Sequence, residues 1–421
     1  LGISEGAKIN FIIKKIFSSI KSISTPIVIL LLVGALAGTW KVSGIIPAMV
    51  YYGLNLVDPA IFLPLTLIVS TLVSLTTGSS YTTSATVGIA LVAVGIAFNI
   101  PAGMTAGAVI SGAYFGDKIS PLSDTTNLAP AMAGTDLYSH IRYMTYTTIP
   151  TYILTLIVFI ILSYSLNISS AGEMSDINSL SNTILNDFYI SPILFVVPAI
   201  VILLAFLKVK PVIALSVGIF SAIIFSIIFQ NNILSSIDTS TLNSLAKSVF
   251  TDTSIPTENL RIQRLYDSGG MKGMLNTIWL VIAAMVFGGT MEAIGALKRI
   301  SFFLISLAKS IVGLFSSTIL SCLTVNITAS DQYLSIVIPG KMFSKAFEDR
   351  NLSSVNLSRT IEDSGTVTSV LIPWNTCGAY QSSVLNVNVS DYFIYAIFNW
   401  LSPIITLIIA SIGYKIKKIN E

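Results

Sequence analysis

Long apolar stretches recur along the whole chain and alternate with short polar clusters. A run of about 17–25 apolar residues is long enough to cross the hydrocarbon core of a bilayer as a helix. Runs near that length lie at 26–40, 61–76, 82–98, 143–166, 190–207, 212–229, 278–291, 302–325 and 392–412. Several of them are short, which is typical of tilted, broken or re-entrant helices. The pattern therefore predicts an all-α polytopic membrane protein.

Composition supports this interpretation. Of the 421 residues, 53% are hydrophobic and only 10% are charged, whereas a soluble domain carries about 25% charged residues. The net charge of +3 gives no reason to expect a nucleic-acid partner. Lysines gather near both ends, at Lys14, Lys15, Lys417 and Lys418, as expected for cytoplasmic flanks of spanning helices.

Little in the sequence indicates enzymatic or cofactor chemistry. No nucleophile and base stand in a recognisable set, and no cofactor motif is present. Cys322 and Cys377 have neither CxxC nor metal-ligand spacing, so both are expected to be packed free thiols. The single histidine, His140, has no second ligand near it in sequence. We expect a transporter and not an enzyme.

Two polar segments divide the chain. The first is expected to be a connecting loop over 167–189, and the second an extramembrane loop over 231–276. These segments suggest one repeat at 1–166 and another at 190–421. The two apolar runs at 190–229 have no counterpart before Lys14, which predicts that further helices precede Leu1.

Three short motifs support the internal repeat. Gly38–Gly44 can be laid over Gly289–Gly295, and the same offset carries Thr77–Ser80 onto Thr328–Asp331. A small gap then pairs Leu122–Thr125 with Ile361–Ser364. Repeats of this kind are typical of secondary transporters, in which the binding site lies at the repeat interface.

The first polar cluster, 74–84, lies between two apolar runs and contains no charge. Hydroxyls such as those of Ser79 and Ser80 can replace water around a cation, and Gly78 permits a break that exposes backbone carbonyls. A hydroxyl-rich helix whose side chains bond their own preceding carbonyls is the alternative.

The second cluster, 116–127, contains Asp117 and Asp124. Their spacing of seven would place them on one face of a continuous helix, but Pro121 makes that helix unfavourable. A carboxylate at the membrane centre is costly and normally has a partner or a function. Lys118 is the alternative partner of Asp117. Thr125, Thr126 and Asn127 supply further oxygens.

The third cluster centres on Asp331, which lies between two apolar runs. Its repeat partner by alignment is the neutral Ser80, so the two halves are chemically unequal. One titratable carboxylate beside hydroxyls would let a proton and a metal cation compete for the same site. We therefore predict competition at Asp331.

The fourth cluster contains Glu362 and Asp363, followed by the hydroxyls of Ser364 and Thr366. Arg359 is the alternative ion-pair partner of both acids. Further along, Pro373 and Asn375 indicate a second broken helix lined by polar groups.

These clusters closely resemble the NhaC family of Na⁺/H⁺ antiporters. The resemblance rests on 112–129 (GAYFGDKISPLSDTTNLA), on Asp331-Gln-Tyr-Leu-Ser, on Glu362-Asp-Ser-Gly-Thr and on 372–379 (IPWNTCGA). It implies a bacterial inner-membrane antiporter with two inverted repeats and broken or re-entrant helices. One departure is Tyr81-Thr82-Thr83, where family members often have Trp-Gly-Thr. Some members exchange malate and lactate, so the family leaves the organic substrate open.

The first hypothesis is Na⁺/H⁺ exchange by alternating access, in the service of pH homeostasis. The expected ion and proton ligands are Asp124, Asp331, Asp363, Asp117 and Glu362, with Na⁺ at the first three, and the supporting oxygens are those of Ser79, Ser80, Thr125, Thr126, Asn127, Ser364, Thr366 and Asn375. Gly78, Pro121 and Pro373 are expected to open the helices. The alternative is Na⁺-coupled exchange of small carboxylates such as malate and lactate, held by Lys118 or Arg359. Lipids are the other expected partners, and homodimerisation stays open.

Overall fold

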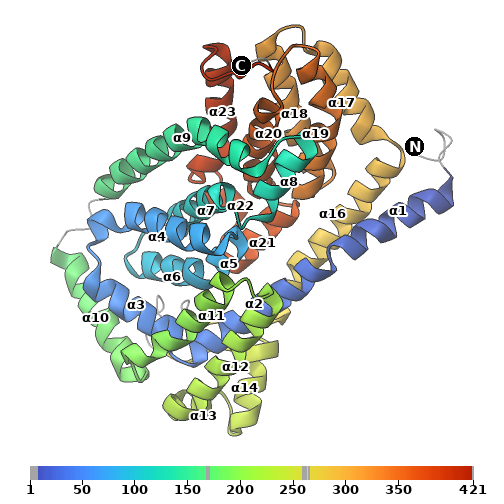
Figure 1. The fold of residues 1–421 in the computed structure, drawn as a ribbon. Coiled ribbons are helices and arrows are strands. Elements are labelled where there is room, and N and C mark those ends of the chain that lie inside the picture. Colours follow the sequence, from blue (N-terminus) through green and yellow to red (C-terminus); the bar gives the residue numbers. More distant parts are fainter. Residues whose placement is uncertain (1–7, 167–170, 258–262, 264–265, 420–421) are drawn as a thin grey trace.

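The computed structural model describes residues 8–166, 171–257, 263 and 266–419. In these residues every regular secondary-structure element is a helix, and β structure is limited to two isolated bridges (Figure 1). Seven helices in this part of the chain are long and apolar enough to cross a membrane, or eight if the bent pair 178–187 and 192–206 forms one span. The predicted polytopic all-α class is confirmed.

The first half of the chain runs to the end of a long helix at Ser165. Its elements are α1 (Ile9–Ser22), α2 (Ser24–Val42), α3 (Ile45–Leu56), η1 (Pro59–Ile61), α4 (Phe62–Thr77), α5 (Ser80–Thr83), η2 (Ser84–Gly88), α6 (Ile89–Ala97), α7 (Ala102–Ile119), α8 (Asp124–Ala133) and α9 (Leu137–Ser165). Helices α4 and α7 pack closely because two glycines face α4. A Cβ atom at Gly112 would lie 2.3 Å from the Leu67 carbonyl oxygen, and one at Gly116 would lie 2.6 Å from Cβ of Ser74. Small residues four apart allow this approach between spanning helices.

The middle of the chain, where the sequence predicts polar connecting segments, contains several helices. It contains α10 (Ala171–Asp187), η3 (Pro192–Phe195), α11 (Val196–Phe206), α12 (Pro211–Phe229), α13 (Asn231–Ile237) and α14 (Thr241–Phe250). Helix α14 packs against α2, where a Cβ atom at Gly38 would lie 2.0 Å from the Ser248 carbonyl oxygen. Much of the segment expected as an extramembrane loop is therefore helical and docked on the bundle.

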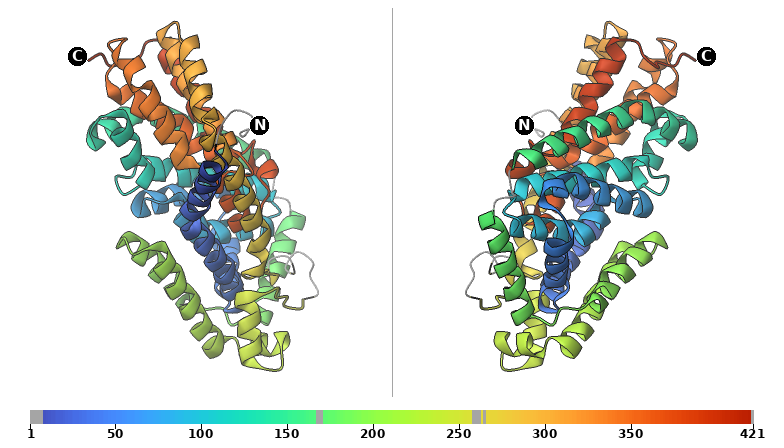
Figure 2. Two further views of the ribbon diagram at one scale, coloured as in Figure 1. Left: turned by 90° about the vertical axis from the view of Figure 1, so that its right-hand side faces the viewer. Right: turned by 90° about the vertical axis from the view of Figure 1, so that its left-hand side faces the viewer.

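The second half begins beside α1. Its elements are η4 (Lys272–Met274), α16 (Leu275–Ala293), α17 (Ala296–Leu307), α18 (Ile311–Thr328), α19 (Gln332–Glu348), α20 (Ser354–Ile361), η5 (Glu362–Thr366), η6 (Ser369–Leu371), α21 (Thr376–Leu385), α22 (Val389–Tyr392) and α23 (Ile397–Ser411). Helices α1 and α16 lie side by side (Figure 2), and Lys15 forms an ion pair with Glu292 at 2.6 Å between them. The last span begins at Ile397 and not at Tyr392.

Helix lengths recur between the two halves. Helices α2 and α16 have 19 residues each, and α3 and α17 have 12 each. The start of α2 is separated from that of α16 by the same number of residues as the start of α3 from that of α17. Gly44 and Gly295 precede α3 and α17, and both adopt a left-handed backbone with φ of 78° and 71°. The spacing then grows by one residue at Ala329, after which α8 and α21 match with 10 residues each.

This recurrence changes two of the pairings expected from sequence. Asp331 caps α19 as Ser79 caps α5, so its counterpart is Ser79 and not Ser80. Asp124 begins α8 as Thr376 begins α21. Asp363 instead lies within a continuous helical run, so it does not correspond to Asp124. The alignment of short sequence motifs missed the one-residue insertion near Ala329, because a single extra position barely alters an apolar pattern.

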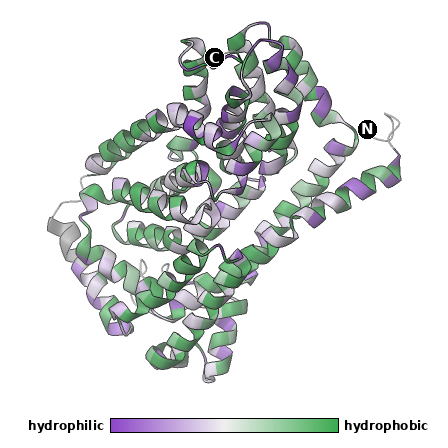
Figure 3. Ribbon diagram, in the orientation of Figure 1, coloured by the Kyte–Doolittle hydropathy of each residue, from purple (hydrophilic) through white to green (hydrophobic). Residues whose placement is uncertain are grey.

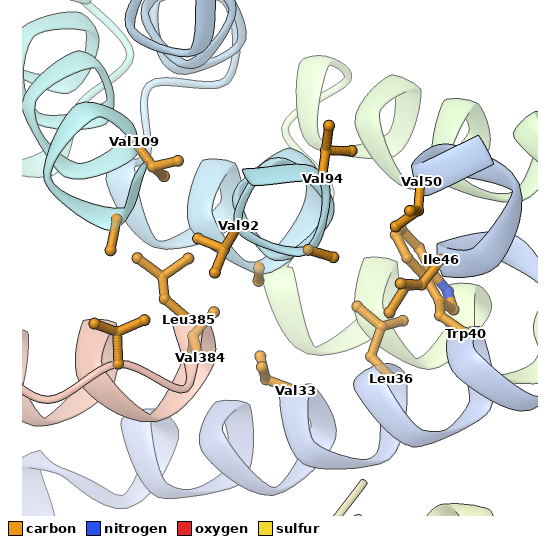
Figure 4. Packing of buried hydrophobic residues seen from close by; sticks show 14 of the residues in the cluster. Val33, Leu36, Trp40, Ile46, Val50, Val92, Val94, Val109, Val384 and Leu385 are labelled. Atoms are coloured by element: carbon orange, nitrogen blue, oxygen red, sulfur yellow. The ribbon is translucent and has the colours of Figure 1, made fainter. Parts of the chain in front are cut away.

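The core is aliphatic and joins helices from both halves. Figure 4 shows Val33 of α2, Val92 of α6 and Val109 of α7 facing Val384 and Leu385 of α21. On the outside, hydrophobic residues cover α9 and α12 (Figure 3), including the exposed Ile161 and Phe220. An apolar exterior of this extent is suited to lipid.

Candidate functional site

A break between α4 and α5 positions the first polar cluster. Gly78 ends α4 with φ of 65°, a left-handed conformation that favours glycine. Ser79 then caps the next helix, because its hydroxyl oxygen accepts a hydrogen bond from the Thr82 N–H at 3.2 Å. The break predicted at Gly78 is present, and the Ser79 hydroxyl serves as a helix cap.

Asp117 lies in the last turn of α7 and faces this break. Its carboxylate accepts hydrogen bonds from the Ser80 hydroxyl at 2.7 Å and from the Ser80 N–H at 3.1 Å. The helix ends at Ile119, two residues before Pro121, as the proline predicted. Lys118 points elsewhere, so the alternative that it pairs with Asp117 is wrong.

Lys118 instead forms an ion pair with Asp363, and both side chains are fully buried. The second carboxylate oxygen of Asp363 accepts a hydrogen bond from the Thr406 hydroxyl at 2.6 Å. The Lys118 ammonium also donates to Ser402 at 3.2 Å. Ser402 and Thr406 lie on α23 and were missed from sequence, because hydroxyls in an apolar run carry no distinctive signal.

Arg359 lies close by but does not pair with either acid through a hydrogen bond. Its guanidinium is fully buried and lies 5.4 Å from the centre of the Tyr143 ring. None of its three side-chain nitrogens has a hydrogen-bond partner within the described residues. The alternative that Arg359 pairs with Glu362 or Asp363 is therefore wrong, and Asp363 pairs with Lys118 instead.

Glu362 begins a π-helical turn, η5, that directly continues α20. Such single turns often occur at functional sites. Its side chain is fully buried, and neither carboxylate oxygen makes a hydrogen bond within the described part of the chain. The groups near enough to act on its charge include Lys118, Thr366, Asp117 and Thr125.

Further buried hydroxyls lie near Asp117 and Glu362. The Thr125 and Ser123 hydroxyls lie 3.1 Å apart at the start of α8, and the Thr366 hydroxyl has no hydrogen-bond partner among the described residues. We use the term "Asp117–Glu362 cluster" for six residues that lie near one another, namely Ser80, Asp117, Ser123, Thr125, Glu362 and Thr366. It joins α5, α7 and α8 of the first half to η5 of the second.

Asp331 takes a structural position at the start of α19. Its carboxylate accepts a hydrogen bond from the Leu334 N–H at 2.9 Å, which caps the helix. Ser330 before it adopts φ of 59°, so the chain reverses there as it does at Gly78.

Several expected oxygen ligands are occupied by backbone contacts. The Thr126 hydroxyl donates to the Lys118 carbonyl at 2.9 Å, and the Ser364 hydroxyl donates to the Thr360 carbonyl at 2.5 Å. The Asn127 amide donates to the Pro121 carbonyl at 3.0 Å. These side chains stabilise helix ends and turns, as the hydroxyl-rich alternative anticipated.

The break after Pro373 is held by buried amides. The Asn375 side-chain oxygen caps α21 through the Cys377 N–H at 3.0 Å, and its amide donates to the Asn326 carbonyl at 3.1 Å. Asn326 in turn donates to the Gly365 carbonyl at 2.8 Å, inside the π-helical turn. Asn326 was missing from the predicted ligands, although a lone amide in an apolar span is a usable signal.

The three acids expected to hold Na⁺ have different surroundings. Asp363 is paired with Lys118, Asp331 caps a helix and Asp124 is exposed. Within the described residues, no three His, Cys, Asp or Glu side chains come together as a metal site. His140 is buried and lies 2.9 Å from the Ser358 hydroxyl, and both cysteines are buried free thiols, as predicted.

Comparison with known proteins identifies the family. The profile of the family described as "Na+/H+ antiporter family" matches residues 112–414. The chain belongs to the Na⁺/H⁺ antiporter family. That range contains Asp117, Glu362 and the Lys118–Asp363 pair, so the family match covers most of the candidate site. It also identifies the chain as a transporter, and its apolar helices make it a multi-pass protein of the bacterial inner membrane.

Relatives of this antiporter-family chain include proteins with different named substrates. It is 37% identical to the Na⁺/H⁺ antiporter NhaC of Alkalihalophilus pseudofirmus, over 93% of this chain and 83% of that protein. It is 33% identical to the malate-2H⁺/Na⁺-lactate antiporter of Bacillus subtilis, over 96% and 83%. It is 34% identical to the arginine/ornithine antiporter ArcD of Halobacterium salinarum, over 92% and 79%.

Proposed function

We propose that the protein exchanges Na⁺ for H⁺ across the bacterial inner membrane, and that both ions compete for the Asp117–Glu362 cluster. The NhaC relative named as a Na⁺/H⁺ antiporter supports the choice of ions. The observation that carries the location is Glu362, a fully buried carboxylate with no hydrogen bond among the described residues.

The chemistry of the cluster fits an alkali cation. Carboxylate and hydroxyl oxygens are hard ligands of the type that hard cations prefer. An ionised carboxylate buried in a membrane protein needs a compensating charge, and a proton or a Na⁺ ion can supply it. When Na⁺ leaves, protonation of Glu362 removes the uncompensated charge. The two ions therefore exclude each other at one site.

The Lys118–Asp363 pair has a different role in this proposal. Both groups are already compensated, because the lysine binds the aspartate directly. Asp363 is the neighbour of Glu362 in sequence, so the pair holds the π-helical turn that carries Glu362 against α7. In this proposal the pair positions Glu362 and does not itself exchange ions.

Alternating access would follow from two repeats, at 1–166 and 190–421, in inverted orientation. The recurring helix lengths and the matching breaks at Gly78 and Ser330 support a repeat. Asp117 comes from the first half and Glu362 from the second, so the cluster lies between them. A rocking motion of one half against the other would open this site to each side in turn.

Exchange in liposomes tests the proposal. Purified protein would be reconstituted with a pH-sensitive dye inside, and a Na⁺ gradient would drive proton movement. We expect Glu362→Gln to abolish Na⁺-dependent proton movement, because the amide cannot release a proton. Glu292→Gln makes the same chemical change at the partly exposed Lys15 ion pair and serves as the control. Full pH-dependent exchange by Glu362→Gln would refute the location.

A specific observation favours carboxylate exchange as the second candidate. Arg359 is buried, and its nitrogens have no hydrogen-bond partners within the described chain, so its guanidinium is able to bind an organic carboxylate. The relative named as a malate-2H⁺/Na⁺-lactate antiporter points the same way. Proton movement that needs malate or lactate in the assay, and that Arg359→Gln removes, would establish this function in place of simple Na⁺/H⁺ exchange.

A further inference from the structure

A cavity of about 530 Å³ shares no lining residue with the Asp117–Glu362 cluster. It is formed by the start of α9, the start of α20 and the segment that follows α23, and its lining includes Arg142, Tyr143, Tyr146, Lys415 and Lys417. The lining contains three cationic side chains and no acidic one. A cavity of this character is suited to an anion.

The segment after α23 is fixed in place beside this cavity. The Lys417 carbonyl accepts hydrogen bonds from the Ser353 N–H at 2.9 Å and from the Asn356 amide at 2.7 Å. The Asn356 oxygen in turn accepts the Lys417 N–H at 3.2 Å, and Asn356 is fully buried. The backbone that carries Lys415 and Lys417 is therefore anchored to the start of α20.

Two aromatic rings lie close to one of the cations. The Lys415 ammonium lies 5.3 Å from the centre of the Tyr146 ring and 6.0 Å from that of Tyr414. Tyrosines and lysines at the ends of spanning helices mark the level of the lipid headgroups. The cavity is thus expected at the membrane–water interface.

An apolar stripe continues from the cavity along the same face of α9. Arg142 and Tyr146 line the cavity, and Ile149, Ile153 and Ile157 follow at three- and four-residue steps. These steps place all five side chains on one face of the helix, and the three isoleucines are exposed. A cationic end followed by an apolar stripe has the polarity of a phospholipid, with its headgroup above its acyl chains.

We propose that this cavity binds the headgroup of an anionic phospholipid, whose acyl chains lie along the isoleucine face of α9. A free phosphate or carboxylate would use the cations but would leave the apolar stripe without a function. Basic pockets between spanning helices are suited to anionic lipid headgroups. The site shares no residue with the Asp117–Glu362 cluster, and its Tyr143 ring lies 5.4 Å from the Arg359 guanidinium.

Native mass spectrometry of the purified full chain tests this proposal. Phosphatidylglycerol and phosphatidylcholine with identical acyl chains would be offered in equal amounts. We expect retention of phosphatidylglycerol and a loss of roughly tenfold or more of this preference in the triple variant Arg142→Gln/Lys415→Gln/Lys417→Gln, since each cation near a membrane surface contributes measurably to binding.

The matched control is Lys208→Gln/Lys210→Gln/Lys247→Gln. It removes the same charge from exposed positions around α11, α12 and α14, and it should keep the preference. Equal retention of the two lipids by the wild type, or an equal loss in both triple variants, would overturn the proposal. Displacement of phosphatidylglycerol by millimolar inorganic phosphate would also overturn it, because the cavity would then be a site for free anions.

Discussion

Lys118 and Asp363 form an ion pair across the two halves of the chain, and neither side chain is accessible to solvent. Neutralising both charges at once makes their burial tolerable, whereas one charge left alone in the membrane interior is costly. The pair therefore fixes α7 against the π-helical turn that carries Glu362, which is the neighbour of Asp363 in sequence.

The first prediction concerns the stability that depends on this pair. Lys118→Met leaves the Asp363 carboxylate without its partner and should lower stability by about 3–5 kcal/mol, the usual loss when one member of a buried pair is removed. Thermal unfolding in detergent measures the change. The double variant Lys118→Met/Asp363→Leu should recover most of the loss. A double variant as unstable as the single one would show that packing, and not charge pairing, holds this contact.

The second prediction concerns the hydroxyl that donates to Asp117. Ser80→Ala removes the 2.7 Å hydrogen bond, and hydrogen bonds to charged groups contribute about 1.5–3 kcal/mol. We expect the apparent affinity for Na⁺ to fall by roughly tenfold or more in the liposome assay, because about 1.4 kcal/mol corresponds to a factor of ten.

Ser84→Ala is the matched control for this change. Ser84 is also buried and lies one turn later, but its hydroxyl has no hydrogen-bond partner among the described residues. Its variant should bind Na⁺ as the wild type does. Equal losses of affinity in both variants would mean that the helix, and not the contact with Asp117, is sensitive to substitution.

The third prediction separates the two roles considered for Asp331. Asp331→Ala removes the cap of α19 and should cost about 1 kcal/mol, whereas Asp331→Asn keeps a capping oxygen and should cost less. Thermal unfolding distinguishes these outcomes. Because Asp331→Asn keeps the helix cap, any change in its exchange activity would come from the loss of the charge. If its proton movement loses its pH dependence while Glu362→Gln keeps it, competition occurs at Asp331 and not at Glu362.

The fourth prediction compares two glycines with left-handed backbones. Gly78→Ala and Gly295→Ala share an unfavourable φ, which costs about 1–2 kcal/mol for an L side chain. A Cβ atom at Gly78 would also lie 2.6 Å from Cβ of Leu122, while one at Gly295 meets nothing within 4 Å. Gly78→Ala should therefore lower the unfolding temperature more than Gly295→Ala does. Equal shifts would remove the steric argument for the α4–α5 break.

The sequence by itself determined the class of protein and the positions of the helix breaks. Apolar runs of spanning length have few alternatives in a chain with 10% charged residues, because buried charges are costly in lipid. Gly78, Pro121 and Pro373 act locally, through the backbone conformations that glycine permits and proline restricts, although Pro130, Pro150, Pro339 and Pro403 lie inside helices. The helices end where Gly78, Pro121 and Pro373 predict.

Only the tertiary structure decided which polar side chains meet. Lys118 and Asp363 are 245 positions apart, and the nearest opposite charges in sequence, Asp117 and Arg359, are not their partners. Direction along a helix changes by about 100° per residue, so adjacent residues face different neighbours. Asp117 faces Ser80 while Lys118 faces Asp363, and the packing of the two halves alone sets Glu362 apart without a hydrogen-bond partner among the described residues.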